Sequence, residues 1–138
     1  MKTPGERSME RKAGKIQKEP GGRNALGKHA EDIGAAWLAS RGMRIIERNY
    51  RCPIGEIDLI GQINGTLVIV EIRSRRSESW GTPAESVTIR KRQKLRKVAA
   101  WYLSQHGKTD EACRFDVLGI LFDEKGSARK VEWIPDAF

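Results

Sequence analysis

Residues 55–73, GEIDLIGQINGTLVIVEIR, have the pattern of a β-hairpin with Asn64 and Gly65 at its turn. A two-residue type I′ turn needs a positive φ at both turn positions, and Asn-Gly is a preferred pair for it. With that turn, Ile63 pairs with Thr66, and the rest of the ladder follows by counting outward. The segment therefore predicts two antiparallel strands with a defined register.

The same register collects charged side chains on one face of the hairpin. Side chains alternate along a strand, so Asp58 would lie opposite Glu71 with Cβ atoms roughly 5 Å apart. Glu56 would lie opposite Arg73 on that face. Facing carboxylates repel, and a divalent metal such as Mg²⁺, which prefers oxygen ligands, is the simplest compensating cation. The alternative is that both carboxylates point to solvent.

Length and charge narrow the class of protein. The 138 residues suit one domain, with 26 Lys and Arg against 18 Asp and Glu and a net charge of +8. This balance favours polyanionic partners, nucleic acid first and anionic membrane second. No apolar run approaches the roughly 20 residues of a membrane span, and the beginning of the sequence does not have the pattern of a secretory signal. The two cysteines form no CxxC pair, so we expect free thiols and a cytoplasmic protein.

The chain divides into a tail and one domain. Residues 1–23 hold few large apolar side chains and more basic than acidic ones, which predicts a flexible basic tail. This arm either contacts nucleic-acid phosphates or is a solvated tail without function. Residues 24–138 predict a single domain. Apolar spacing predicts helices over 24–41 and 84–104 and strands over 43–50, 114–122 and 131–134, beside the hairpin.

Basic residues follow the hairpin in two groups. Arg75 and Arg76 precede Trp80, and basic side chains beside an aromatic one fit phosphate contact with base stacking. The alternative is a surface loop with Trp80 packed on the core. Arg90 and Lys94 lie off the apolar stripe of the second helix, on a surface that is either solvated or faces phosphates.

Lys91 differs from the other basic residues of the second helix. It falls in the apolar stripe, between Val87 and Leu95. A lysine at such a position is uncommon unless it is paired or its stem reaches out to solvent. We therefore expect Lys91 either to meet a carboxylate or to snorkel at the rim of the contact between helix and sheet.

Several motifs together resemble the YraN-like bacterial proteins: GKHAE, RNYR, GEIDLI, VEIRSR, a helix with a lysine, and RFDV. The resemblance runs from about residue 24 to 120. That family is similar to the restriction-endonuclease-like nucleases, and to the archaeal Holliday-junction resolvases in particular. The resemblance implies an α/β fold with an αβββαβ core, in which helices flank a mixed central sheet.

The resemblance also implies a chemistry. Asp58 and Glu71 would hold Mg²⁺ or Mn²⁺, and Glu31 of the first helix would join the metal site. The implied function is hydrolysis of phosphodiester bonds in nucleic acid, most simply DNA, with branched DNA among the substrates. The alternative is a non-catalytic nucleic-acid-binding module on a nuclease fold. A homodimer also stays open, because resolvases cut two strands symmetrically.

One position departs from the family pattern. The catalytic Glu-x-Lys appears here as Glu71-Ile72-Arg73. Arginine stabilises negative charge, but its pKa above about 12 prevents it from exchanging protons. We expect Glu56 to hold Arg73 across the strands, and Lys91 to supply the catalytic cation in its place. If Lys91 does not do so, hydrolysis is weak or absent.

Overall fold

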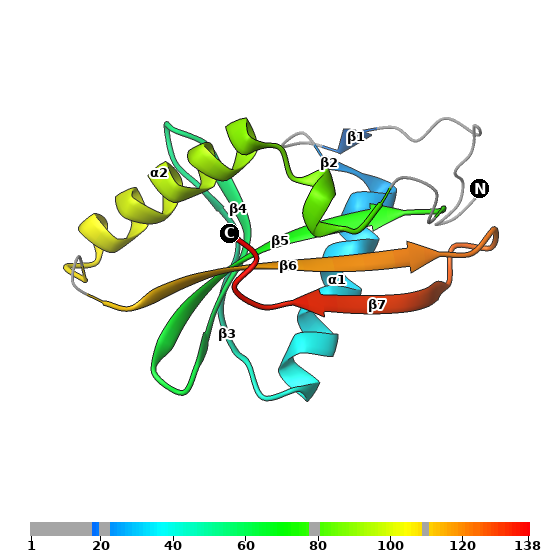
Figure 1. Cartoon of the computed structure of the whole chain (residues 1–138), viewed down its shortest axis with the longest axis horizontal. Helices are drawn as coiled ribbons and strands as arrows, with labels where there is room; N and C mark the ends of the chain where they lie inside the picture. Colours follow the sequence, from blue (N-terminus) through cyan, green and yellow to red (C-terminus); the bar gives the residue numbers. More distant parts are fainter. Residues whose placement is uncertain (1–17, 20–22, 78–80, 109–110) are drawn as a thin grey trace.

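The computed structural model of the chain describes residues 18–19, 23–77, 81–108 and 111–138 (Figure 1). Most of the predicted tail, residues 1–17 and 20–22, lies outside the described residues. The elements in chain order are β1 (Lys18–Glu19), β2 (Arg23–Asn24), α1 (Ala25–Ser40), β3 (Arg44–Arg51), β4 (Glu56–Ile63), β5 (Thr66–Arg75), the 3₁₀ turn η1 (Ala84–Ser86), α2 (Ile89–Gln105), β6 (Cys113–Phe122) and β7 (Ala128–Ile134).

One five-stranded sheet forms the centre of the domain. Its strand order is β3-β4-β5-β6-β7, and β1 and β2 form a separate antiparallel pair. β5 and β6 run parallel because α2 carries the chain across between them, and the other neighbours are antiparallel. The sheet is therefore mixed, and the predicted α/β class is confirmed.

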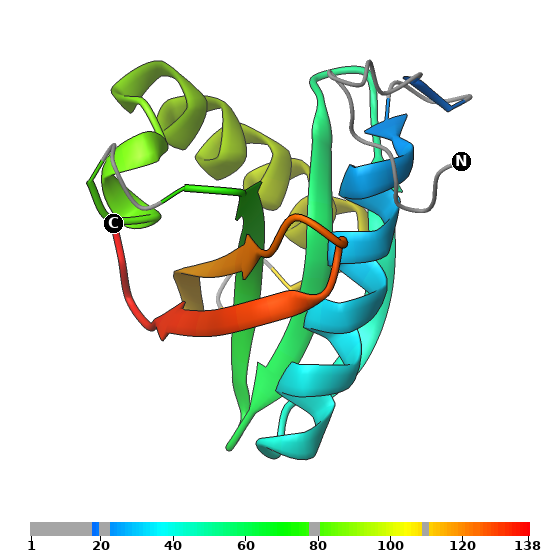
Figure 2. The ribbon, with the colours of Figure 1, turned by 90° about the vertical axis from the view of Figure 1, so that its right-hand side faces the viewer.

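The two helices cover opposite faces of this sheet, as Figures 1 and 2 show. One core cluster joins Leu38 of α1 to Val68 and Leu118 of the sheet. The other joins Leu95 of α2 to Ile69 and neighbouring residues on the opposite face. None of the described helices is long and apolar enough to cross a membrane.

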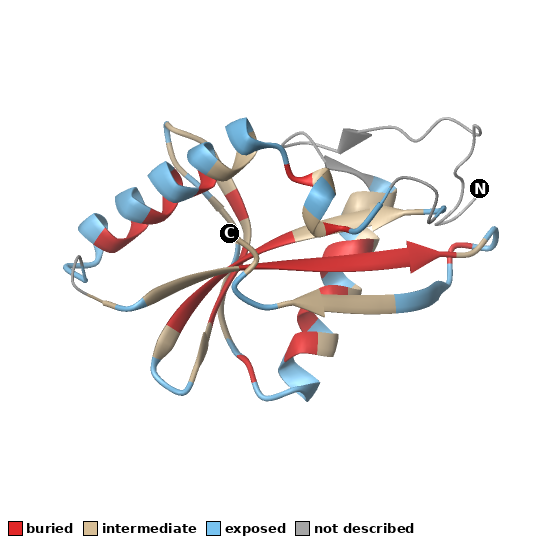
Figure 3. Cartoon of the chain, viewed as in Figure 1, coloured by how far each residue is buried: buried red, intermediate tan, exposed pale blue. Residues whose placement is uncertain are grey.

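β5 is the central strand that its apolar sequence predicted. Residues 67–71 are all buried, and the buried stretches of β5 and β6 run side by side in Figure 3. A strand covered on both faces favours a continuous apolar run, which Leu67 to Val70 supply. Glu71 follows this run directly and is itself only 4% exposed. The fold thus places a carboxylate at the end of the buried run of its central strand.

The hairpin has the predicted turn and register. Asn64 and Gly65 have φ angles of 48° and 81°, as a type I′ turn requires. The ladder between β4 and β5 pairs Ile63 with Thr66 and continues through Leu59 and Val70. The described pairing ends there.

The second predicted helix, residues 84–104, is wrong as one continuous element. η1 and α2 are separate because Val87 is extended and Thr88 caps α2, with φ −65° and ψ 160°. The Thr88 hydroxyl accepts a hydrogen bond from the Lys91 N–H at 3.1 Å. The predicted edge strand 131–134 is also too short, since β7 begins at Ala128.

Candidate functional site

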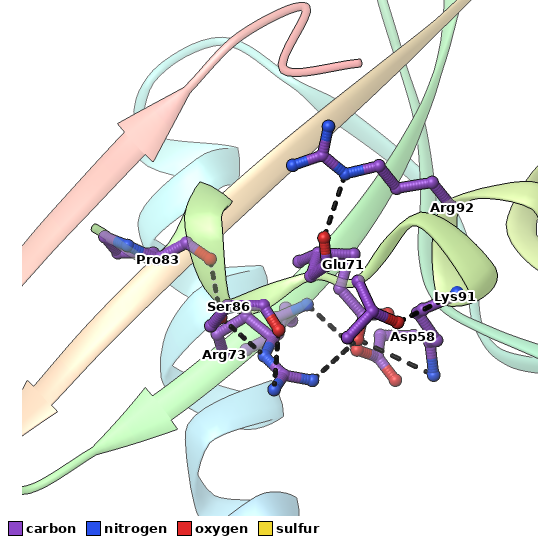
Figure 4. Close-up of polar contacts among 10 residues, drawn as sticks. Asp58, Glu71, Arg73, Pro83, Ser86, Lys91 and Arg92 are labelled. Atoms are coloured by element: carbon purple, nitrogen blue, oxygen red, sulfur yellow. Dashed lines mark hydrogen bonds and ion pairs between the residues drawn. The ribbon is translucent and has the colours of Figure 1, made fainter. Parts of the chain in front are cut away.

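The site begins where β4 leaves β5. Beyond the pair of Leu59 and Val70, Asp58 Oδ2 accepts the Ile72 N–H at 2.9 Å (Figure 4). A side-chain oxygen thus takes a backbone donor of β5 that a longer ladder would have used. The result is a fork between the two strands, with a carboxylate fixed inside it.

Three carboxylates influence one another at this fork. Glu71 is 4% exposed and Glu31 of α1 is 5% exposed. The pKa of Asp58 is raised from 3.8 to about 8, first by burial of its carboxyl group, then by the charge of Glu71 and, more weakly, that of Glu31. The Ile72 N–H and the charge of Lys91 act in the opposite direction. The structure thus gathers the three predicted acidic residues, and their burial and mutual repulsion favour the protonated form of Asp58.

Two cations approach the same oxygen of Glu71. Arg73 Nη1 lies 3.4 Å from Glu71 Oε2, and Lys91 Nζ lies 3.7 Å from it (Figure 4). The Lys91 side chain is 40% exposed, so its amine reaches the carboxylate from the rim of the site. Lys91 thus combines the two placements expected for it, because its amine lies beside a carboxylate and its side chain reaches outward at the rim. Its catalytic role stays a prediction.

The predicted pairing of Glu56 with Arg73 is wrong. Because the ladder of β4 and β5 ends before these residues, β4 pairs at this level with β3. Glu56 Oε1 there accepts Arg51 Nε at 3.1 Å. Arg73 instead donates from Nε to Ser86 Oγ at 3.1 Å.

The predicted nucleic-acid contacts fall on two elements and a loop. Arg75 ends β5 and donates to the Gly81 carbonyl, and Arg76 is exposed just after it. Arg90 and Lys94 are exposed in the first half of α2. Trp80 lies outside the described residues.

The carboxylate oxygens at the fork are ligands of the kind that a hard divalent cation prefers, but they do not complete its coordination sphere. Asp58 and Glu71 offer carboxylate oxygens, which Mg²⁺ and Mn²⁺ prefer. A cation here would also relieve the repulsion that raises the pKa of Asp58. Within the described part of the chain, however, no group of three or more His, Cys, Asp or Glu residues is arranged to hold a metal ion. Asp58 and Glu71 thus match the ligand preference of such an ion, but the described residues do not by themselves complete a site for it.

Sequence reasoning missed two residues beside the site, Ser86 and Arg92. Ser86 accepts from Arg73, and Arg92 Nε donates to the Val87 carbonyl at 2.9 Å. The serine gave no signal beyond its place in a loop, and the target of Arg92 is a backbone oxygen, which no residue type reveals. Ser86 therefore lies in the connection between β5 and α2, and Arg92 binds that connection from α2.

Asp116 of the RFDV motif has a structural role. It is fully buried and accepts Arg114 Nε at 2.9 Å and Trp133 Nε1 at 2.8 Å. The backbone N–H of Asp136 also donates to it. These bonds tie the end of the chain to β6.

Comparison with known proteins identifies the family. Residues 30–120 match the profile of "Uncharacterised protein family UPF0102". The chain belongs to this family. A UPF0102 protein of Moorella thermoacetica is 46% identical over 116 residues, which cover 84% of this chain and 97% of the relative. A UPF0102 protein of Pelotomaculum thermopropionicum is 42% identical over the same length and the same coverage.

The UPF0102 match confirms the predicted YraN-like family and spans all of the fork residues. Among solved structures, the chain is similar to "The structure of Pyrococcus Furiosus SfsA in complex with Ca2+". The sequences are 15% identical, the TM-score is 0.39, and the likeness covers 84% of this chain and 74% of the other. At that TM-score the likeness supports no argument about this UPF0102 protein.

Proposed function

We propose that this protein hydrolyses phosphodiester bonds in nucleic acid, DNA first, with Mg²⁺ or Mn²⁺ as its cofactor. One observation carries the proposal: Asp58 and Glu71 meet Lys91 at the end of a buried strand. Isolated carboxylates with this burial would cost stability, and a protein retains such an arrangement where the site has a use for it.

Each residue has a role in this proposal. Asp58 and Glu71 would hold the metal, helped by Glu31 and the Ile72 carbonyl. When bound, the ion polarises a phosphate oxygen and lowers the pKa of a coordinated water. Lys91 Nζ reaches the site from α2, where its charge would stabilise the negative charge that develops on the phosphate. Arg73 adds positive charge but exchanges no proton.

The charge of the surface supports a polyanionic substrate. α2 carries six basic residues and no acidic one along Ile89–Gln105. Arg90 and Lys94 are exposed on this helix, which also delivers Lys91 to the site. Phosphate contacts of this kind hold a nucleic acid without reading its sequence. Contacts along the first half of α2 would then place the scissile phosphate at the metal site formed by Asp58 and Glu71.

A second function is favoured by the two cations on Glu71. Arg73 and Lys91 already share the charge of Oε2, so Glu71 has less need of a metal. A protein with this arrangement can bind nucleic acid without cutting it. The two candidate functions, cleavage and binding of nucleic acid, use the same surface and differ in whether the fork binds a metal ion.

Metal binding and cleavage together test the proposal. We expect Mg²⁺ or Mn²⁺ to raise the melting temperature by mass action and to support cleavage of branched, nicked or single-stranded DNA. Asp58→Asn should abolish cleavage and most of the metal-induced rise. Asp32→Asn is the matched control, because Asp32 is an exposed carboxylate on α1 paired with Arg48.

The outcomes separate the two functions. Equal metal shifts in wild type and Asp58→Asn would remove Asp58 from the metal site. DNA binding without cleavage in any metal would leave the binding module as the function.

A further inference from the structure

We infer that Arg73 is a positioning residue, which fixes η1 so that α2 presents Lys91 to Glu71. The inference rests on the proposed function, in which Lys91 is the catalytic cation. It concerns how the chain works with arginine at the position where the family pattern has lysine.

The first link joins β5 to η1. Arg73 Nε donates to Ser86 Oγ at 3.1 Å, and Nη2 donates to the Ser86 carbonyl at 3.5 Å (Figure 4). Ser86 Oγ in turn donates to the Pro83 carbonyl at 2.6 Å, within the same turn. Two nitrogens of one guanidinium group therefore bind one residue of η1, and only Nη1 reaches Glu71.

The second link joins η1 to α2. Arg92 Nε donates to the Val87 carbonyl at 2.9 Å, and its Nη2 donates to the Ala84 carbonyl at 3.0 Å. Thr88 then caps α2 by accepting the Lys91 N–H. The helix start is thus bound on both sides of Lys91, so the position of η1 sets the position of the Lys91 backbone.

A third contact seats the turn on the sheet. Pro83 packs over Gly119 of β6, where an added Cβ would lie 2.2 Å from Pro83 Cγ. The glycine allows the turn to approach the strand this closely. η1 is thereby held between β5 and β6, which are themselves paired in parallel.

Arginine suits this role better than lysine. Its planar group places three nitrogens in a fixed fork, whereas a lysine amine is a single point of charge on a flexible stem. At position 73 the fork binds Ser86 and Glu71 together. A lysine there could stay beside Glu71, but it could not also make both contacts to Ser86. Arg73 thus holds η1 in place, and Lys91 supplies the amine beside Glu71.

The experiment follows Lys91 in the full chain by NMR with ¹³C-labelled lysine. Loss of one signal in Lys91→Met assigns the Lys91 resonance. We expect Ser86→Ala and Arg73→Gln to move that resonance to the position of exposed lysines, and Ser86→Thr, which keeps a hydroxyl, to restore it. Arg51→Gln is the matched control, since it removes another arginine–glutamate pair from the same sheet and should leave the resonance unchanged.

Cleavage, where it is seen, gives a second measurement. Ser86→Ala should lower kcat by about tenfold or more with little change in KM, because it displaces a catalytic group without touching the substrate. An unchanged Lys91 resonance in both Ser86→Ala and Arg73→Gln would overturn the inference. So would an equal change in Arg51→Gln. The NMR result does not depend on cleavage, so the inference and the proposed function can fail separately.

Discussion

Replacing Asp58 by asparagine should stabilise the metal-free protein, and the gain should grow with pH. Asparagine is neutral and keeps a carbonyl oxygen for the Ile72 N–H, so the bond of 2.9 Å can persist. The negative charge that burial and Glu71 disfavour is removed. A substitution in the candidate metal site would therefore strengthen the fold, in contrast to most buried substitutions.

The magnitude follows from the pKa of Asp58, which rises from 3.8 to about 8 on folding. Between these values the folded state keeps a proton that the unfolded state has lost. Stability is therefore greatest below the unfolded pKa and falls as pH rises through the folded one. At 1.36 kcal/mol for each pKa unit, the full shift corresponds to about 6 kcal/mol, of which about 2–3 kcal/mol falls between about pH 6 and 9.

Urea unfolding at several pH values without metal measures this effect. The free energy of unfolding of Asp58→Asn, minus that of wild type, should increase by about 2–3 kcal/mol between about pH 6 and 9. Contributions from titrating groups that do not interact with Asp58 cancel in this difference. Asp32→Asn should run parallel to wild type, because Asp32 is exposed. A constant difference between Asp58→Asn and wild type would refute the reasoning.

Two further predictions concern the surface and the loop. The double variant Arg90→Ala/Lys94→Ala should reduce the slope of log affinity for duplex DNA against log salt concentration by about 2. Filter binding at several salt concentrations measures this slope. An unchanged slope would mean that other residues contact the phosphates. Gly119→Ala should destabilise the protein by about 1–3 kcal/mol, because its Cβ would lie 2.2 Å from Pro83 Cγ. Thermal unfolding measures this loss, and an unchanged melting temperature would contradict the close approach of Pro83 to Gly119.

The hairpin was predictable because its signals are local. Asn64 and Gly65 define the turn, and alternation along the strands then fixes the register. Asp58 and Glu71 came together by the same counting. Placing Lys91 near Glu71 needed only the helical spacing of residues 87–95 and the knowledge that a lysine on an apolar stripe needs a partner.

The departures from prediction arise where distant segments meet. No local signal marks the end of the ladder at Leu59 and Val70, so Glu56 was assigned to Arg73 instead of Arg51. The break between η1 and α2 depends on Thr88, whose capping bond competes with helix continuation. Apolar spacing carries across such a cap and thus predicts one helix where the chain has two elements.

Because its predicted partner was wrong, the role expected for Arg73 also changes. With Glu56 as its partner, Arg73 would be a bystander and Arg73→Lys would matter little. The structure gives it Ser86 and Glu71 instead, which puts it in contact with both the loop and the carboxylate. Arg73 and Lys91 then act at the same oxygen from two elements, and η1 connects those elements. Under the proposed function, Arg73 and Lys91 therefore divide what the family pattern assigns to one lysine: one positions, and the other supplies the amine.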